Sequence, residues 1–425
     1  MKLVRTAASL RHDSLHRNAI LLIASTGIVS VLGFGFWMIA THYFSPVQIG
    51  LAASLISATS LLTNLAFLGF NNTLVRYIPK ASDKSKYVNT ALLVTALGSL
   101  FFSAIFMLGI RAFTPDLATK LHGLQYLIVA AYVAIAVANA MFDSLFVAGR
   151  AAHLILIKNT IVSAIKLALP VVFVSLGFMG IFSAIVVATV VGLAFSITCA
   201  YRRGIRLQAN IDKEVIAEVK SYAIGNYLAS VFGVMPTTLL PIMVTSVLGA
   251  RHAAYFYMPM MIATLLNVIP SSAAQSLLAE ASHHPEHLHK YILKTIRGIL
   301  TILTPAILVI LAAGSLILLA FGKDYSSEGI VVLRLLAAAS IFGAINYIGD
   351  TVLNIRKEIK GYIWMNAINA ALILVACYSM MKWWGLIGAG AGWLTGQVLT
   401  AIIYLGVYGK RELHDTRNAR LQSGR

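Results

Sequence analysis

The chain has 425 residues, of which 59% are hydrophobic and only 11% charged, and its formal net charge is +18. A soluble domain carries about 25% charged residues, so this chain has too few polar side chains to cover a water-exposed surface of its size. The composition therefore excludes an ordinary soluble protein and indicates a chain that lies mostly in a lipid bilayer.

Long apolar stretches follow one another along the chain, and we expect each to cross the membrane as a helix. In chain order the expected spans are 18–41, 49–71, 88–110, 123–148, 154–176, 178–200, 223–248, 254–277, 298–320, 329–353, 361–381 and 386–407. The first is too long to be the apolar part of a cleaved signal peptide. The predicted fold class is an all-α polytopic membrane protein of about twelve transmembrane helices.

The basic residues are divided unevenly between the two sides of this arrangement. If the N-terminus is cytoplasmic, 25 Lys and Arg residues fall in the inside segments and five in the outside loops. Cytoplasmic loops of membrane proteins carry an excess of Lys and Arg, so we expect both termini in the cytoplasm. The same distribution explains the net charge without a nucleic-acid partner.

The hydropathy pattern repeats with a shift of 204 residues, which relates the start of the first span to the start of the seventh. Each half has an even number of spans, so both halves enter the membrane from the same side, as parallel repeats do. The expected organisation is an N-terminal six-helix lobe at 1–200, a cytoplasmic linker at 201–221, a C-terminal six-helix lobe at 222–410 and a basic cytoplasmic tail at 411–425.

Small residues inside the spans have structural interpretations. Gly388, Gly392 and Gly396 lie within the last span, where a spacing of four forms a ridge on which helices approach closely. We prefer this interpretation to a dinucleotide-binding loop. The two cysteines, Cys199 and Cys377, both fall inside apolar stretches, so no structural disulfide is expected.

A tract with four histidines, His283 to His289, raises the question of a metal site. Pro285 interrupts the helical spacing that would align two of them, so we expect a solvated cytoplasmic loop and no metal. The loops contain no G-x-x-x-x-G-K-[ST] phosphate-binding motif. We therefore expect no cofactor.

Charged residues inside the spans are few, and each costs roughly 2.5–3.5 kcal/mol at the bilayer centre even on the gentler insertion scale. The clear examples are Asp143, Lys158, Lys166 and Arg334. Asp143 and Lys158 flank the turn around Arg150 symmetrically, so in an antiparallel hairpin they stand at equal depth. We expect an ion pair there, and the pattern is equally compatible with a purely structural role and with a role in gating.

Lys166 lies near the middle of the fifth span. At about 100° per residue, it falls on one face of the helix with Asn159, Ser163 and Pro170, and this polar stripe is expected to face protein or water. The alternative for Lys166 is a structural role, in which it bonds carbonyl groups exposed by a kink. Arg334 lies near the outer end of the tenth span and is long enough to reach the membrane interface.

Prolines are concentrated in the spans of the second lobe. Pro236 and Pro241 interrupt the seventh span and are preceded by Gly225 and Gly233. Each proline removes a helical hydrogen bond, so kinks are expected. Such kinks are commonly static packing features, but the pair in the seventh span is our candidate for a hinge.

Two stretches of the first lobe carry a family resemblance, Phe44-Ser-Pro-Val-Gln-Ile-Gly-Leu51 and Leu68-Gly-Phe-Asn-Asn-Thr-Leu-Val-Arg-Tyr-Ile-Pro-Lys80. Here the chain resembles the polysaccharide transporter family of the multidrug, oligosaccharidyl-lipid and polysaccharide flippase superfamily. The span number, the two-lobe repeat and the basic linker extend the resemblance over essentially the whole chain. Members often carry an acidic residue just before the Leu-Gly, but this chain reads Leu65-Ala-Phe-Leu-Gly69, so any cation-coupling site stays unassigned.

The resemblance implies a flippase that moves a polyisoprenyl-diphosphate-linked oligosaccharide across the bacterial cytoplasmic (inner) membrane by alternating access, for surface polysaccharide assembly. A diphosphate needs cationic partners, and Lys166 with Lys158 or Arg334 is suited to supply them, with Asn159 and Ser163 beside Lys166. The expected partners are the lipid-linked oligosaccharide, membrane lipids and other polysaccharide-assembly membrane proteins.

Two other functions stay open. A multidrug exporter of the same superfamily typically binds organic cations and is expected to carry cavity carboxylates, for which Asp143 alone is poor support. A membrane enzyme acting on lipid-linked sugars usually has a long extracytoplasmic catalytic loop. The longest outside loop here is 111–122, so we expect a transporter and not an enzyme.

Overall fold

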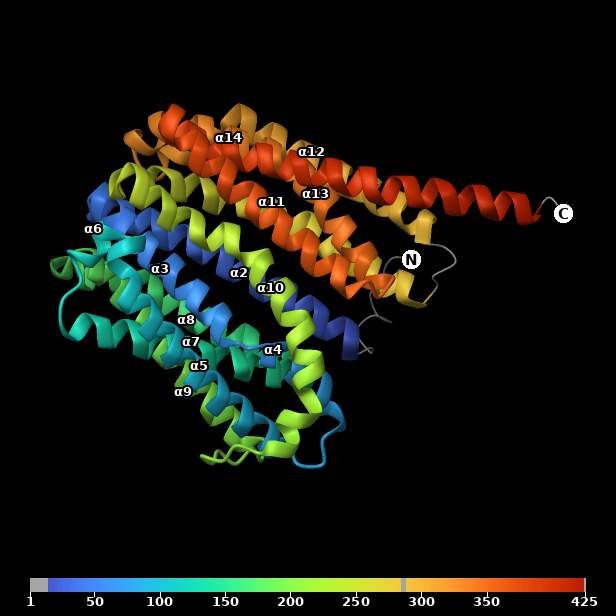
Figure 1. The fold of residues 1–425 in the computed structure, drawn as a ribbon. Coiled ribbons are helices and arrows are strands. Elements are labelled where there is room, and N and C mark those ends of the chain that lie inside the picture. The colour runs from blue at the N-terminus through green and yellow to red at the C-terminus, as the bar shows by residue number, and fades with distance from the viewer. Residues whose placement is uncertain (1–13, 284–287, 424–425) are drawn as a thin grey trace, which may run out of the picture. The chain divides into compact units, whose positions relative to one another are not determined.

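A computed structural model describes residues 14–283 and 288–423 of the chain (Figure 1). Within these ranges the regular structure is helical, without strands. The fold divides into two compact units: unit 1 ends at Val231 and unit 2 begins at Phe232. This boundary falls inside a single helix, α10 (Lys213–Leu248), which is therefore shared by the two units.

Unit 1 is a bundle in which α7 is central, with α3, α4, α5 and α9 packed against it, while α2 packs along α8. Its core contains the fully buried rings of Phe142 and Phe146. The elements are α2 (Ser14–Tyr43), α3 (Pro46–Ala66), α4 (Phe70–Tyr77), η1 (Ile78–Lys80), α5 (Lys84–Phe113), α6 (Pro115–Ala118), α7 (Leu124–Ala148), α8 (Ala152–Val172), η2 (Val174–Leu176) and α9 (Phe178–Arg202).

Unit 2 is built around α13, which packs against α11, α12 and α14. In Figure 1 these helices run side by side, coloured from yellow to red. Their bounds are α11 (Ala250–His283), α12 (Leu288–Leu319), α13 (Lys323–Ile355) and α14 (Ile359–Ser423). The C-terminal half of α10 also belongs to this unit.

Eleven helical segments of the described chain are long and apolar enough to cross a membrane. The last, Ile359–Val407, has 49 residues, more than twice the roughly 20 that a bilayer requires. Its backbone is non-helical at Gly385, where φ is 56°, so it divides into two spans. The all-α polytopic fold of about twelve spans is thereby confirmed.

The glycine ridge of α14 brings the two spans of this helix together. A Cβ on Gly392 would lie 2.4 Å from the Cα of Cys377, and one on Gly396 would lie 2.5 Å from the Cγ1 of Ile373. No side chain fits at such distances, so the predicted close helix packing is confirmed. The two cysteines of the chain are free thiols.

The second span is broken near its C-terminal end, a feature that the hydropathy pattern does not reveal. Helix α3 ends at Ala66, and Leu68 and Gly69 then adopt φ values of 48° and 81° before α4 begins. A Cβ on Gly69 would lie 2.5 Å from the backbone oxygen of Ala223 in α10. Glycine is needed here both for the left-handed backbone and for the close approach of α10. The expected single span 49–71 is corrected accordingly.

The same backbone turn joins α7 to α8 and α13 to α14. In each, the residue after the turn donates its N–H to the carbonyl five residues back, Ala151 over 2.8 Å and Glu358 over 2.9 Å. Each turn contains a non-glycine residue with positive φ, Arg150 at 50° and Lys357 at 59°. These residues stand 207 positions apart, close to the 204-residue shift of the hydropathy repeat. The hairpin is therefore repeated in detail.

The segment between α9 and α10 is held against the start of α5. The amide of Asn89 donates to the carbonyl of Arg206 over 3.0 Å. Asp212 caps α10 by accepting hydrogen bonds from the N–H groups of Val215 and Glu214. These backbone donors hold the pKa of Asp212 below its usual range.

Helix α10 has contacts of its own in each unit. In unit 1, Val219 is buried in the core, and the Tyr227 hydroxyl donates to the carbonyl of Leu65 over 2.6 Å. In unit 2, a Cβ on Gly233 would lie 3.2 Å from the Oδ1 of Asn366 in α14. The helix thus has close neighbours in each unit over a short stretch of sequence.

Candidate functional site

The polar stripe of α8 faces α2, its principal neighbour in unit 1. The amide of Asn159 donates to the Oγ of Ser25 over 3.0 Å, and the Nζ of Lys166 lies 5.1 Å from the centre of the Phe36 ring. Ser163, between them on the helix, is buried. Part of this stripe therefore lies against α2 within unit 1.

Lys166 is a half-buried cation whose observed contact is a ring face. The ion pairs among the described residues do not include it. A cation–π contact contributes about 0.5–2 kcal/mol, whereas a charge at the bilayer centre costs roughly 2.5–3.5 kcal/mol or more. Phe36 alone therefore offsets only part of that cost, and an anion beside Lys166 would be strongly stabilised.

The structure brings Asp143 and Lys158 together. The Nζ of Lys158 lies 2.6 Å from one carboxylate oxygen of Asp143 and 2.7 Å from the other. The same nitrogen lies 3.4 Å from the Oδ1 of Asn139, and the Lys158 residue is only 4% exposed. The charge of this ammonium is thus compensated within the hairpin, which distinguishes it from Lys166.

The other residues predicted for the site, Arg334, Pro236 and Pro241, lie outside the polar stripe of α8 and outside the Asp143–Lys158 ion pair. Arg334 is on α13 in unit 2 and is exposed. Pro236 and Pro241 lie in α10, which stays helical through both, just after the unit boundary.

The histidine tract is largely outside the described residues, because residues 284–287 are not part of them. In the part of the chain that is described, no three His, Cys, Asp or Glu side chains gather as metal ligands. The expectation of a solvated loop stays a prediction.

A second intramembrane carboxylate, Asp350 in α13, is absent from the sequence-based candidates. Its Oδ1 accepts hydrogen bonds from the hydroxyl of Tyr404 over 2.6 Å and from the amide of Asn366 over 2.9 Å, both in α14. The expected tenth span ends at residue 353, which places Asp350 at its edge, whereas α13 continues to Ile355. The signal that identifies it is the repeat, once its shift is set to the 207 residues that separate the two turns.

The repeated hairpin relates Asp350 to Asp143, since each stands seven residues before its turn residue. The same register places Met365 in the position of Lys158. Unit 2 therefore has the equivalent half-buried carboxylate but not the lysine that neutralises it in unit 1. The ion pairs among the described residues do not include Asp350.

Solved structures with this arrangement of helices are membrane transporters. The lipid II flippase MurJ, in an inward closed conformation, aligns with a TM-score of 0.74 over 92% of this chain and 87% of its own, at 12% identity. An inward-facing multidrug resistance MATE family transporter of the MOP superfamily aligns with a TM-score of 0.66 over 93% of this chain and 99% of its own, at 15% identity. At these identities the likeness shows the fold alone.

Within that fold, the chain belongs to the family described as polysaccharide biosynthesis protein, whose model matches residues 15–278. Both stretches that carry the sequence resemblance lie inside this range, and the resemblance is confirmed. A Shigella flexneri protein named for O-antigen transport is 21% identical over 168 residues, which are 39% of this chain and 40% of that protein. The match thus spans about two fifths of that relative's length.

Proposed function

We propose that the protein is a flippase that moves a polyisoprenyl-diphosphate-linked oligosaccharide across the bacterial cytoplasmic membrane for surface polysaccharide assembly. The observation that carries the proposal is the family match over residues 15–278. The fold shared with a lipid II flippase supports a lipid-linked substrate. Transport of this kind breaks no bond: the two units expose a cavity to each side of the membrane in turn.

Lys166 is the residue that we assign to the anionic headgroup of the substrate. It lies in the middle of α8, and no carboxylate of the described chain neutralises it. A diphosphate accepts charge-assisted hydrogen bonds from an ammonium, and a low-dielectric site strengthens them. Asn159 and Ser163 lie on the same face of α8, and Arg334 of unit 2 is the second cation proposed to contact the substrate.

Lys158 is held by Asp143. We assign this ion pair the role of gating or stabilising the α7–α8 hairpin.

The bending element of the transport cycle is α10. It crosses the unit boundary, and Pro236 and Pro241 follow directly, each removing one backbone hydrogen bond. A helix weakened beside a boundary between two compact bodies is suited to act as a hinge.

Charge distribution supports a topology with both termini in the cytoplasm. A single cysteine at the exposed Thr119, after α6, tests it, because the loop 111–122 is then external. We expect a membrane-impermeant thiol reagent to label this variant in intact cells. The native cysteines are replaced beforehand as the control, and labelling only after lysis would reverse the topology.

The central test removes or reverses the charge of Lys166 in a strain that lacks the native gene. Deletion is expected to accumulate a lipid-linked oligosaccharide on the inner leaflet. Lys166→Ala and Lys166→Glu are expected to abolish transport at near-normal expression, whereas Lys166→Arg retains part of it. Lys382 is a matched control, since its Nζ also lies over a ring, 4.4 Å from the centre of Tyr378, near the Gly385 break.

Lys382→Glu is expected to transport normally. A well-expressed Lys166→Glu variant that still supports surface glycan assembly would eliminate the headgroup assignment. Loss of folded protein in Lys166→Ala, without a specific transport defect, would favour the structural role instead.

Asp350 is the observation that favours the second candidate, an exporter of organic cations. A carboxylate without a cationic partner suits such a substrate, and one of the similar folds is a multidrug resistance transporter. The two functions differ in the phenotype of the deletion. Sensitivity to cationic dyes without a lipid-linked intermediate would replace the flippase assignment by this one.

A further inference from the structure

An apolar groove of about 390 Å³ lies within unit 2, between α12, α13 and α14. It is lined by aliphatic side chains of α12 between Ile292 and Leu300, by those of α13 between Ile341 and Val352, and by Tyr404 and Leu405 of α14. Leu300, Ile341 and Leu405 are among the exposed hydrophobic residues, so the groove is open to the surface of the chain. The charged side chain in its lining is Arg356.

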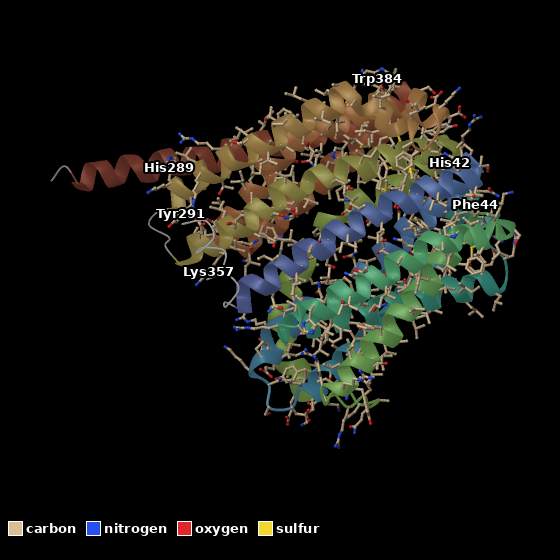
Figure 2. All side chains as sticks on the ribbon, turned by 180° about the vertical axis from the view of Figure 1, so that it is seen from behind. His42, Phe44, His289, Tyr291, Lys357 and Trp384 are labelled. Carbon is tan, nitrogen blue, oxygen red and sulfur yellow. The ribbon has the colours of Figure 1, made fainter. Side chains whose placement is uncertain are left out.

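The Arg356 end of the groove is the basic end of unit 2. Figure 2 places Tyr291, His289 and Lys357 at one end of the unit and Trp384 at the opposite end. Other basic residues of this end, close in sequence to the groove residues of α12 and α13, are Lys290, Lys294, Arg297 and Lys360. Two acids lie among them: Glu358 follows Lys357, and Glu280 pairs with Lys294 over 3.9 Å, so basic residues still outnumber acidic ones around the opening.

The apolar lining has the depth of one membrane leaflet. From Ile341 to Val352 a helix rises about 16 Å, and half of a hydrocarbon core is about 15 Å. The groove thus extends from the basic end to the middle of the bilayer. An open apolar groove at this depth offers water no hydrogen bonds, so a hydrocarbon chain is its natural occupant.

We propose that this groove binds the acyl chain of an anionic phospholipid, with the lipid phosphate on Arg356. By the topology proposed above, the lipid belongs to the cytoplasmic leaflet. A phospholipid fits the lining better than the glycan-bearing substrate does. The polar side chains of the groove are Arg356 and Tyr404, and the Tyr404 hydroxyl already donates to Asp350. One guanidinium suits one phosphate, and the lining formed by the described residues has no further polar side chain for the second phosphate or the sugars of a lipid-linked oligosaccharide.

The test measures retained and titrated lipid on the full-length protein in detergent by native mass spectrometry, with phosphatidylglycerol and phosphatidylcholine as probes. We expect the wild type to bind phosphatidylglycerol about tenfold more tightly than phosphatidylcholine, and Arg356→Gln to remove this preference. Lys360→Gln is the matched control, since it removes one charge at the same end outside the lining. It is expected to keep the preference.

A second pair of variants tests the groove itself. Ile345→Trp fills it, and Leu308→Trp adds the same bulk on an exposed part of α12 that does not line it. We expect the first to lower phosphatidylglycerol binding about tenfold and the second to leave it unchanged. Equal losses in Arg356→Gln and Lys360→Gln would mean a diffuse charge effect and overturn the proposal. Displacement of phosphatidylglycerol by an equimolar polyisoprenyl diphosphate would overturn it too, because the groove would then belong to the transported substrate.

Discussion

The hairpins α7–α8 and α13–α14 share a turn and a half-buried carboxylate, yet they hold that carboxylate in different ways. Asp143 is neutralised by Lys158, whereas Asp350 accepts from the neutral donors Tyr404 and Asn366. The position of the lysine is taken by Met365 in the second hairpin. The repeated hairpin thus holds one carboxylate in an ion pair and the other by neutral hydrogen-bond donors.

The two units therefore differ in the charged side chains that they place inside the membrane. In unit 1 the paired residues are neutral together, and Lys166 is the charge that stays uncompensated. In unit 2 the exposed Arg334 and the hydrogen-bonded Asp350 stand apart from the ion pairs of the described chain. Removing one member of an ion pair leaves a bare charge, whereas removing a charge held by neutral donors leaves hydrogen bonds.

The largest effect is expected when Lys158 of unit 1 is replaced by methionine, the residue that unit 2 has at the equivalent position. Lys158→Met leaves the half-buried Asp143 without its cation, which is expected to cost up to about 3–5 kcal/mol. The measurement is the free energy of unfolding in detergent. The double variant Asp143→Asn/Lys158→Met is expected to recover much of the loss, so strictly additive losses in the double-mutant cycle would show that the pair contributes no interaction energy.

The reverse exchange tests whether the two hairpins are equivalent at this position. Met365→Lys places an amine in the register of Lys158, where Asp350 is available to pair with it. We expect this variant to stay folded, whereas Met365→Lys/Asp350→Asn buries an unpaired ammonium and loses about 3 kcal/mol or more. Equal yields of folded protein for the two variants would mean that the hairpins are not equivalent at this position.

A smaller effect is expected from Asp350→Asn. The amide removes the buried charge and can still accept from Tyr404 and Asn366, so the unfolding free energy is expected to change by about 1 kcal/mol or less. Asp143→Asn is the matched control and is expected to cost several times more, because it strands Lys158. A loss as large as that of the control would indicate a cationic partner of Asp350.

The smallest effect concerns the shared turn. Arg150 and Lys357 both have positive φ, which glycine adopts at less cost than other residues. Arg150→Gly and Lys357→Gly are each expected to stabilise the protein by about 0.5–1 kcal/mol, measured as a rise in Tm. Unequal shifts would show that one turn is strained by its surroundings and the other is not.

Much of the fold follows from hydropathy, because a span needs only length and apolar composition. The pairing of Asp143 with Lys158 also follows from sequence, since equal distances from a hairpin turn give equal depth. The break at Leu68 and Gly69 does not, because it depends on the approach of α10 at Ala223, far along the chain.

The hydrogen bonds of Asp350 in unit 2 could not be predicted from the sequence for a related reason. Asp350 lies near a helix end, where the limits of a span are least certain from sequence. Its donor Tyr404 belongs to another span, and no periodicity within one helix can reveal such a contact. The 207-residue register of the turns would have identified Asp350, but the coarser 204-residue shift relates Asp143 to Tyr347 instead.

Helix α10 sets a limit on how the chain length can vary. Tyr227 is hydrogen-bonded to Leu65 in unit 1, and Gly233 lies close to Asn366 in unit 2. One inserted residue between these points would rotate everything after it by about 100° and advance it by about 1.5 Å, turning a side chain toward Asn366. The segment 203–212 before the helix is not itself helical, so a change of length there does not rotate the residues of α10 relative to one another. Insertions and deletions among relatives are therefore expected in that segment and not between Tyr227 and Gly233.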